Sequence, residues 1–465
     1  MSNAAAPSAK LRRLHGARPI LALVAAITIA ALSHLVAAPS APLTGNAGPL
    51  SDGAAVETIG STDSAAALPI GSLEQIDHSI RAWTSNVQGN DRDFMSATNL
   101  GLLYDARGRL SGDIGDYLRA KGALEVALAI LPSHLPARLL HARLLQTTHD
   151  FGGALAEATA ILRDDPTQVQ ALATAGDARL ELGDVAGAAS TFTRLATLAP
   201  GAPVTARLSR LAFIQGDPGG AVRLAQAAYD QSAAAGDTGP ALGWYAYLAG
   251  VSDLSTGDPA TGLTWFRRAV ALWPKGYLAL AGEARAEAAL GRPDAAIDLF
   301  RRAVAIAPQP DALAALGDLY SLRGDAKLGA DQYATVEAIG HLAAVNEQVY
   351  NRQLVLFSVN HDRDLAQALV LARNELQIRK DVYGYDAYAW ALLANGRASE
   401  AADAMRQVRA FATKDAVLDY HEGMIALALG DDGRARALLP GALAVAGGLD
   451  PLSAMRARGA LGTLR

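Results

Sequence analysis

The chain contains 465 residues with a formal net charge of −5, and 51% of them are hydrophobic but only 6% are aromatic. Most of the hydrophobic residues are alanine and leucine, which favour helices, so the composition argues against an all-β fold. The absence of cysteine excludes disulfides, thiolate metal sites and a cysteine nucleophile.

The N-terminal segment carries only positive charge. Its first 51 residues contain no acid and four cations, Lys10, Arg12, Arg13 and Arg18. An apolar run over residues 20–32 follows directly, which is the arrangement of a secretory signal. Counted through to Ala38, the apolar region is also about long enough to span a ~30 Å hydrocarbon core. We therefore expect residues 1–38 to be either a signal peptide or a signal-anchor helix that contacts the membrane.

This segment determines the expected location of the rest of the chain. Positive-inside orientation places it outside the cytoplasm, anchored if the segment is kept and secreted if it is cleaved. Residues 39–70 are rich in Pro, Ala, Gly and Ser without a sustained period, which predicts a disordered linker.

The rest of the chain, after the segment with the four cations, has a net charge of −9, which argues against nucleic-acid binding. The preference for arginine over lysine fits a bacterial coding style.

A short motif recurs along residues 71–465. It consists of Gly or His followed by Asp or Arg, with Ala or Gly five positions after the first residue. The motif begins at Gly115, His149, Gly183, Gly216, Gly257, Gly291, Gly324, His361, Gly396 and Gly430. Successive motifs are 33 to 41 residues apart, and most intervals are 33 to 35. Such a period is typical of a repeat architecture.

The residue types in the motif predict a helix, a tight turn and a second helix. Glycine ends the first helix in the left-handed conformation, and the following Asp caps the second helix. Pro218, Pro259 and Pro293 then stand at or near the first helical position, where a missing N–H does no harm. Small residues that face each other on the two helices, such as Gly176 and Ala188, allow close approach.

The pattern resembles that of tetratricopeptide repeat proteins. The resemblance is fullest in Leu313, Leu316-Gly317, Tyr320, Gly329 and Tyr333. It implies an all-α, right-handed superhelical solenoid of about ten helix-turn-helix units over residues 71–465. The segment after Gly448 is then expected to form a C-terminal capping helix.

Sequence signatures of catalysis are missing. The chain has no phosphate-binding glycine loop, no Gly-x-Ser-x-Gly, no His-Glu-x-x-His and no calcium loop. His134, His141 and His149 do not share one helix in the repeat register, because His134 precedes the helix and His149 lies in its terminal turn. We therefore expect neither enzyme activity, nor a metal, nor a cofactor.

The resemblance implies that the first helix of each unit faces a concave groove and contacts ligand there. Transferred residue by residue, it gives these groove positions: Arg143, Asp177, Arg207, Arg210, Trp244, Tyr247, Arg285, Asn351, Arg352, Tyr383, Asp386, Trp390 and Tyr420. Arginine and rigid aromatic side chains are typical of peptide-binding surfaces, and the arginines indicate an acidic partner. Solvated or internally packed side chains are the alternative at each position.

The sequence thus predicts a non-catalytic protein–protein interaction scaffold of the bacterial cell envelope. Its partner is expected to be a protein or peptide that binds in the concave groove. A binding module for an anionic small or polymeric envelope ligand, such as a glycan, is the alternative, because it would use the same arginine and aromatic residues.

Overall fold

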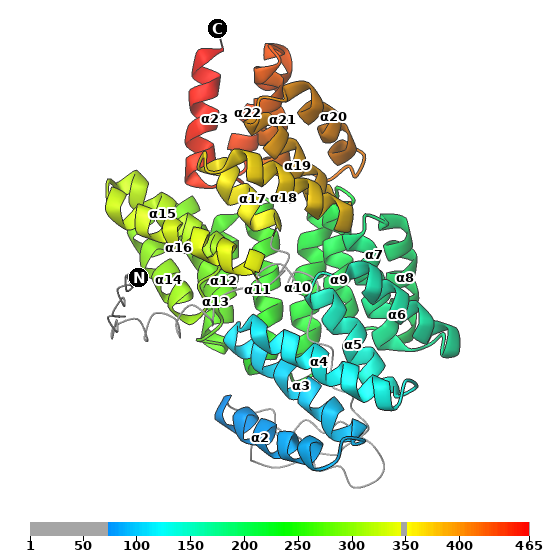
Figure 1. Cartoon of the computed structure of the whole chain (residues 1–465). Coiled ribbons are helices and arrows are strands. Elements are labelled where there is room, and N and C mark those ends of the chain that lie inside the picture. Colours follow the sequence, from blue (N-terminus) through cyan, green and yellow to red (C-terminus); the bar gives the residue numbers. More distant parts are fainter. Residues whose placement is uncertain (1–72, 346–350, 465) are drawn as a thin grey trace, which may run out of the picture.

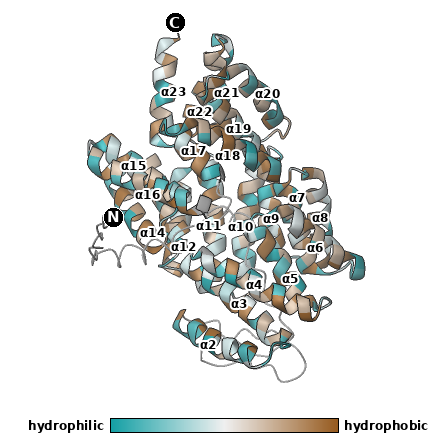
Figure 2. Cartoon of the chain, in the orientation of Figure 1, coloured by the Kyte–Doolittle hydropathy of each residue, from teal (hydrophilic) through white to brown (hydrophobic). Residues whose placement is uncertain are grey.

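The computed structural model describes residues 73–345 and 351–464, which form 22 helices and no strand (Figure 1). The all-α prediction is therefore confirmed. The predicted signal or anchor segment (1–38) and the predicted linker (39–70) lie outside the described residues. No helix of the described part combines the length and apolar character that a membrane span requires. Figure 2 shows that the helices carry both apolar and hydrophilic residues.

Consecutive helices pack against each other in pairs, as a helix-turn-helix repeat requires. The pairs are α3 (Phe94–Ser111) with α4 (Ile114–Ile130), α5 (Leu135–Thr147) with α6 (Phe151–Asp164), α7 (Val169–Glu181) with α8 (Val185–Leu198), α9 (Ala202–Ile214) with α10 (Pro218–Ala234), α11 (Gly239–Ser255) with α12 (Pro259–Leu272), α13 (Tyr277–Ala289) with α14 (Pro293–Ile306), α15 (Pro310–Arg323) with α16 (Ala326–Val345), α17 (Asn351–Asn360) with α18 (Leu365–Ile378), α19 (Val382–Ala394) with α20 (Ala398–Arg409), and α21 (Ala416–Ala428) with α22 (Asp432–Ala444). Helix α2 (Leu73–Gly89) precedes the pairs, and α23 (Pro451–Thr463) packs on α21, α22 and α15. The capping role of α23 stays a prediction.

Most turns inside the pairs have the predicted chemistry, but in the turn between α17 and α18 the left-handed residues are Asp362 and Asp364 rather than His361, and no side-chain hydrogen bond caps α18. Gly183 adopts a left-handed φ of 84°, and the side chain of Asp184 accepts a hydrogen bond from the Gly187 backbone N–H. His149 takes a positive φ of 64° in the corresponding turn before α6. The first turn differs from the prediction, because the left-handed glycine is Gly112 and the cap is Asp113. Helix α4 begins earlier than the motif at Gly115 indicates.

Small residues and large aromatic rings fit together between the two helices of a pair. A Cβ atom added at Gly250 would lie 2.8 Å from Phe266, whose ring is fully buried. A Cβ atom added at Gly176 would overlap Phe192, which is also fully buried. The small residues predicted at these positions therefore let aromatic side chains pack against the helix backbone.

The superhelix returns on itself, so that its C-terminal helices pack on helices in the first half of the chain (Figure 1). The Thr413 hydroxyl donates to the carbonyl oxygen of Ile214 at 2.6 Å, and Arg379 donates to Glu181. These partners are 199 and 198 residues apart. We call this contact the inter-turn seam; it comprises residues 181–183 and 214–216 on one side and residues 379–380 and 412–413 on the other. One hydrophobic core cluster extends across it, from Leu172 to Ala460.

Candidate functional site

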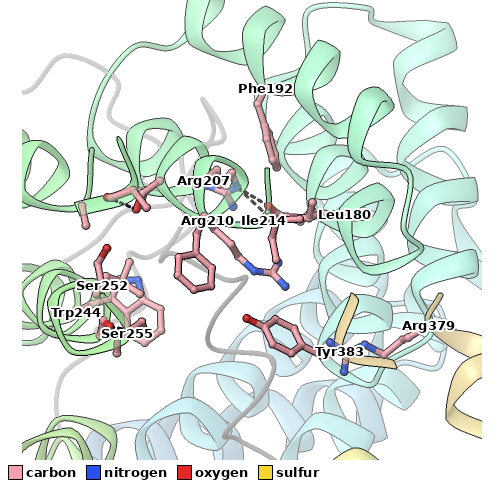
Figure 3. Close-up of a pocket in the computed structure, with 18 of the residues that line it drawn as sticks. Leu180, Phe192, Arg207, Arg210, Ile214, Trp244, Ser252, Ser255, Arg379 and Tyr383 are labelled. Carbon is pink, nitrogen blue, oxygen red and sulfur yellow. Dashed lines mark hydrogen bonds and ion pairs between the residues drawn. The ribbon is translucent and has the colours of Figure 1, made fainter. Parts of the chain in front are cut away.

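A cavity of about 220 Å³ lies next to the inter-turn seam (Figure 3). Its walls come from α7 to α11 on one side, and from α17, α19 and the residue after α18 on the other. In Figure 3, Trp244, Ser252 and Ser255 lie across the cavity from Tyr383 and Arg379. Six of the sequence-predicted groove residues line it: Asp177, Arg207, Arg210, Trp244, Arg352 and Tyr383. The superhelical path therefore brings together residues of the predicted groove from distant units.

Most of the cavity wall is apolar. Helices α7 to α11 contribute aliphatic and aromatic side chains to it, namely Leu180, Phe192, Phe213, Ile214, Leu248 and Val251. Phe192 and Leu180 are buried, whereas Phe213, Leu248 and Val251 are half-buried. Such a wall suits an apolar side chain or ring of a ligand.

The charged groups of the cavity are arranged in buried pairs. Arg207 Nε donates to the two carboxylate oxygens of Asp177 at 3.0 and 2.9 Å. Arg210 Nη2 donates to Glu181 Oε1 at 2.5 Å, and Arg379 donates to the other oxygen of the same carboxylate. Glu181 therefore holds two arginines from opposite sides of the seam.

A fourth arginine of the cavity, Arg352, pairs within the C-terminal helices. Its Nη2 atom donates to Asp381 Oδ1 at 2.6 Å, and its side chain is 6% exposed. The charges of the cavity are thus largely balanced inside the protein.

Two carboxyl groups at the cavity have opposite pKa shifts. Burial raises the pKa of Asp177 to about 6, although Arg207 acts in the other direction. Burial would also raise the pKa of Glu181, but the charges of Arg210 and Arg379 outweigh it and hold that pKa at about 2. The Glu181 carboxylate therefore stays ionised at neutral pH, whereas Asp177 titrates near pH 6.

Three buried guanidinium nitrogens of cavity residues have no hydrogen-bond acceptor among the described residues: Arg210 Nη1, Arg352 Nε and Arg379 Nε. Arg210 Nη1 is buried and makes no hydrogen bond with any described residue. Tyr383, by contrast, donates its hydroxyl to Asp415 Oδ2 at 2.8 Å. A ligand that placed a carboxylate or carbonyl oxygen beside Arg210 would satisfy this donor.

The other predicted groove residues lie away from this cavity, where their partners are mostly in neighbouring units. Arg143 bonds to Asp105, and Arg285 Nη2 donates to Asp311 Oδ2 at 2.5 Å. Asp386 contacts His421 Nδ1 at 2.9 Å. Ligand contact by these side chains stays a prediction.

The aromatic members of that set are packed inside the protein. Trp390 Nε1 donates to Asn360 at 2.8 Å, and its ring stacks on His421 at 4.1 Å. Tyr420 is almost completely buried, and Tyr247 lies against Trp244 and Phe266. Asn351 is the first residue of α17, but its side chain lies outside what the structure describes. The predicted groove is therefore not one continuous exposed surface.

Two features of the cavity were not predicted. Arg379 follows α18, the second helix of its unit, and so lies outside the helices that the resemblance assigns to the groove. Leu248 and Val251 lie one helical turn from Trp244 and Tyr247, so helical periodicity could have found them.

Within the described ranges, no group of three or more His, Asp or Glu side chains is placed to hold a metal ion.

We expect the ionisation of Asp177 to destabilise the folded protein. Its pKa is about 6 when folded and 3.8 for an ordinary Asp, so the folded state binds more protons between these pH values. Stability that depends on this group is therefore fully present below pH 3.8 and is lost as the pH rises from there through about 6. Relative to Asp177→Asn, the wild type should lose about 1–3 kcal/mol between pH 4 and pH 7. Urea unfolding of both proteins across this range measures the difference, and a constant difference would contradict the expectation.

The sequence matches the tetratricopeptide repeat family over residues 139–203 and 247–311. These segments cover most of α5 to α8 and of α11 to α14. No curated protein matches the sequence.

Several solved structures are similar to the chain at low sequence identity. The human IFIT1 dimer with PPP-AAAA is 13% identical, with 80% of this chain and 86% of that chain covered and a TM-score of 0.42. The APC/C hetero-tetramer Cut9-Hcn1 is 15% identical, with coverages of 84% and 82% and a TM-score of 0.38. TTC0263, a thermophilic TPR protein of Thermus thermophilus, is 18% identical, with coverages of 42% and 98% and a TM-score of 0.37.

At these TM-scores the family assignment rests on the two matched segments. The succession of helix pairs, with glycine turns and aspartate caps at the predicted spacing, agrees with it. The chain therefore contains tetratricopeptide repeats in these two segments.

Proposed function

We propose that this protein is a non-catalytic interaction scaffold that binds an acidic segment of a partner protein in the cavity beside the inter-turn seam. Repeats of this family generally mediate protein–protein interaction. The observation that carries the proposal is the combination of an apolar wall with the unpaired donor Arg210 Nη1. A peptide segment with one apolar side chain beside one carboxylate would match both.

Trp244, Tyr383 and Arg210 are the residue types that dominate binding energy at protein interfaces. The apolar wall favours a peptide over the alternative ligand class, an anionic glycan, whose hydroxyl groups would lose water without gaining partners there.

The proposed location is the bacterial cell envelope, with residues 1–38 as signal peptide or membrane anchor and residues 71–465 outside the cytoplasm. The support for it is the sequence order of four cations followed by the apolar run. Protease treatment of spheroplasts tests it: the solenoid should be degraded while a cytoplasmic marker survives. Protection of the solenoid would contradict the proposed location.

A variant that fills the cavity tests the binding site without breaking its ion pairs. Ser255 lines the cavity, is half-buried and ends α11, so Ser255→Trp adds a large ring inside it. Thr264→Trp is the matched control, because Thr264 is exposed on α12 and makes only a bond to its own helix. Circular dichroism establishes that both variants keep their helix content.

The full-length proteins are used to capture partners from an envelope extract. Overlapping synthetic peptides of each captured protein are then titrated against wild type and both variants. The proposal expects a peptide with acidic and apolar residues that binds wild type and Thr264→Trp, and at least about tenfold more weakly to Ser255→Trp. Equal binding to all three proteins would place the interaction elsewhere, and the absence of any peptide ligand would contradict the scaffold proposal.

A further inference from the structure

A second cavity, of about 330 Å³, lies between α6, α7 and α8, away from the cavity beside the seam. Three arginines, one from each helix, line it: Arg163, Arg179 and Arg194. Three hydroxyl side chains accompany them: Thr159, Ser190 and Thr191. No carboxylate belongs to the lining. The floor is apolar and consists of Leu162, Leu172 and Ala175.

The arginines of this cavity retain most of their capacity to bind an anion. Among the described residues, Arg163 has no hydrogen-bond or ion-pair partner, and Arg194 bonds only to the Pro166 carbonyl oxygen. Arg179 Nη1 donates to Thr191 Oγ1 at 2.5 Å and to the Gly187 carbonyl oxygen at 3.3 Å. The nearest carboxylate, that of Asp184, lies 3.8 Å from Arg179 Nε. Three guanidinium groups thus face a volume without a carboxylate in its lining.

The repeat itself supplies an internal comparison for these positions. At the position of Arg163, counted from the small residue of the second helix, the other units have Ala, Thr, Asp or Glu. At the position of Arg179 they have Ser, Leu, Ala, Asp, Glu, Tyr or Phe. Only the position of Arg194 carries arginine again, at Arg268 and Arg302. The repeat fold therefore does not require this combination, which occurs only between α6 and α8.

We propose that the α6–α8 cavity binds a phosphate group, either as the free ion or as the monoester of a small molecule. A phosphate carries a charge of about −1.5 to −2 at neutral pH and three acceptor oxygens, so that three arginines can share it. A carboxylate has one charge and two oxygens and would leave part of this donor set unpaired. The apolar floor and the volume leave room for an organic group on the phosphate. This inference is independent of the proposed scaffold function, because the two cavities share no lining residue.

Isothermal titration calorimetry of the full-length protein with inorganic phosphate and with phenyl phosphate tests the proposal; benzyl alcohol is the uncharged control. Arg163→Gln and Arg194→Gln should each weaken phosphate binding about tenfold, because each removes charged hydrogen bonds. Arg302→Gln is the matched control, because Arg302 occupies the repeat position of Arg194 on α14 and is also exposed. It should bind like wild type.

The two probes distinguish the source of the phosphate. Tighter binding of phenyl phosphate would assign the cavity to a monoester with an apolar group, and tighter binding of inorganic phosphate would assign it to the free ion. The proposal is overturned if wild type binds neither probe saturably, if benzyl alcohol binds as well as phenyl phosphate, or if Arg302→Gln weakens binding as much as Arg194→Gln.

Discussion

Replacing Glu181 by glutamine is expected to lower the free energy of unfolding by about 3–5 kcal/mol, because it leaves Arg210 without a carboxylate partner and Arg379 with only the more distant Glu375 and Asp381. The Glu181 side chain is fully buried and the Arg379 side chain is 2% exposed. Glu181 also accepts from Arg210 at 2.5 Å, so one carboxylate balances arginines from the two sides of the inter-turn seam. A neutral amide cannot compensate either charge. Urea unfolding followed by circular dichroism at pH 7 measures the effect.

The matched control for this substitution is Glu400→Gln. Glu400 pairs with Arg397 three residues earlier on an exposed helix end, and solvent already screens that pair. The control should unfold nearly as the wild type does. If Glu181→Gln also unfolded like the wild type, the buried pairing across the seam would be refuted. The difference should shrink as the pH falls from about 4.5 towards 2, because Glu181 of the unfolded wild type takes up a proton at a higher pH than Glu181 of the folded protein.

The local elements of the fold could be predicted because their causes are local. A left-handed glycine, an aspartate cap and a small residue at fixed distances define each pair, and Gly183, Asp184 and Ala188 behave as these rules require. The first turn was misplaced because Gly115-Asp116 fits the whole rule with Ala120, whereas Gly112-Asp113 has Tyr117 at the position of the small residue. What decides between them is tertiary: Asp116 is buried and accepts two hydrogen bonds from Arg107.

The candidate site could be predicted only in part, because the position of the seam depends on the whole path of the superhelix. Small rotations between successive helix pairs add up over many units, and no single residue in the sequence indicates the total rotation. The groove positions implied by the family resemblance include Arg207, Arg210 and Tyr383, which line the cavity. They could not predict that Arg379 donates a hydrogen bond to Glu181 from the other side of the seam. They also could not predict that Asp177 neutralises Arg207.

Because of the seam, an arginine on the concave side of this solenoid does not by itself indicate a ligand-binding site. In an open groove, such an arginine would be available to pair with an acidic partner. Here the Arg207 side chain is only 9% exposed and is already paired with Asp177. Most arginines of the predicted groove are likewise paired inside the protein, where they join neighbouring units. Binding capacity then remains where pairing is incomplete, at Arg210 Nη1 in one cavity and at Arg163 and Arg194 in the other.

Replacing Gly216 by alanine is expected to destabilise the protein and to open the inter-turn seam. Gly216 has a φ of 81°, where a residue with a Cβ atom loses roughly 1–2 kcal/mol. In addition, a Cβ atom at this position would overlap the carbonyl oxygen of Ala412 on the other side of the seam. A backbone oxygen cannot rotate away as a side chain can, so the two turns of the superhelix must separate. We expect this overlap to add about 1–3 kcal/mol to the conformational term.

Gly291→Ala separates the two contributions. Gly291 has a similar φ of 75° in the equivalent turn before α14, but nothing lies within 4 Å of its added Cβ atom. Both variants therefore share the conformational term, and the difference between their unfolding free energies measures the seam. Since the chain has no cysteine, spin labels on Gln215→Cys and Lys414→Cys, both exposed beside the seam, report its opening directly. The label-to-label distance distribution should broaden in Gly216→Ala and stay unchanged in Gly291→Ala, and identical behaviour of the two variants would show that the turns do not touch at this residue.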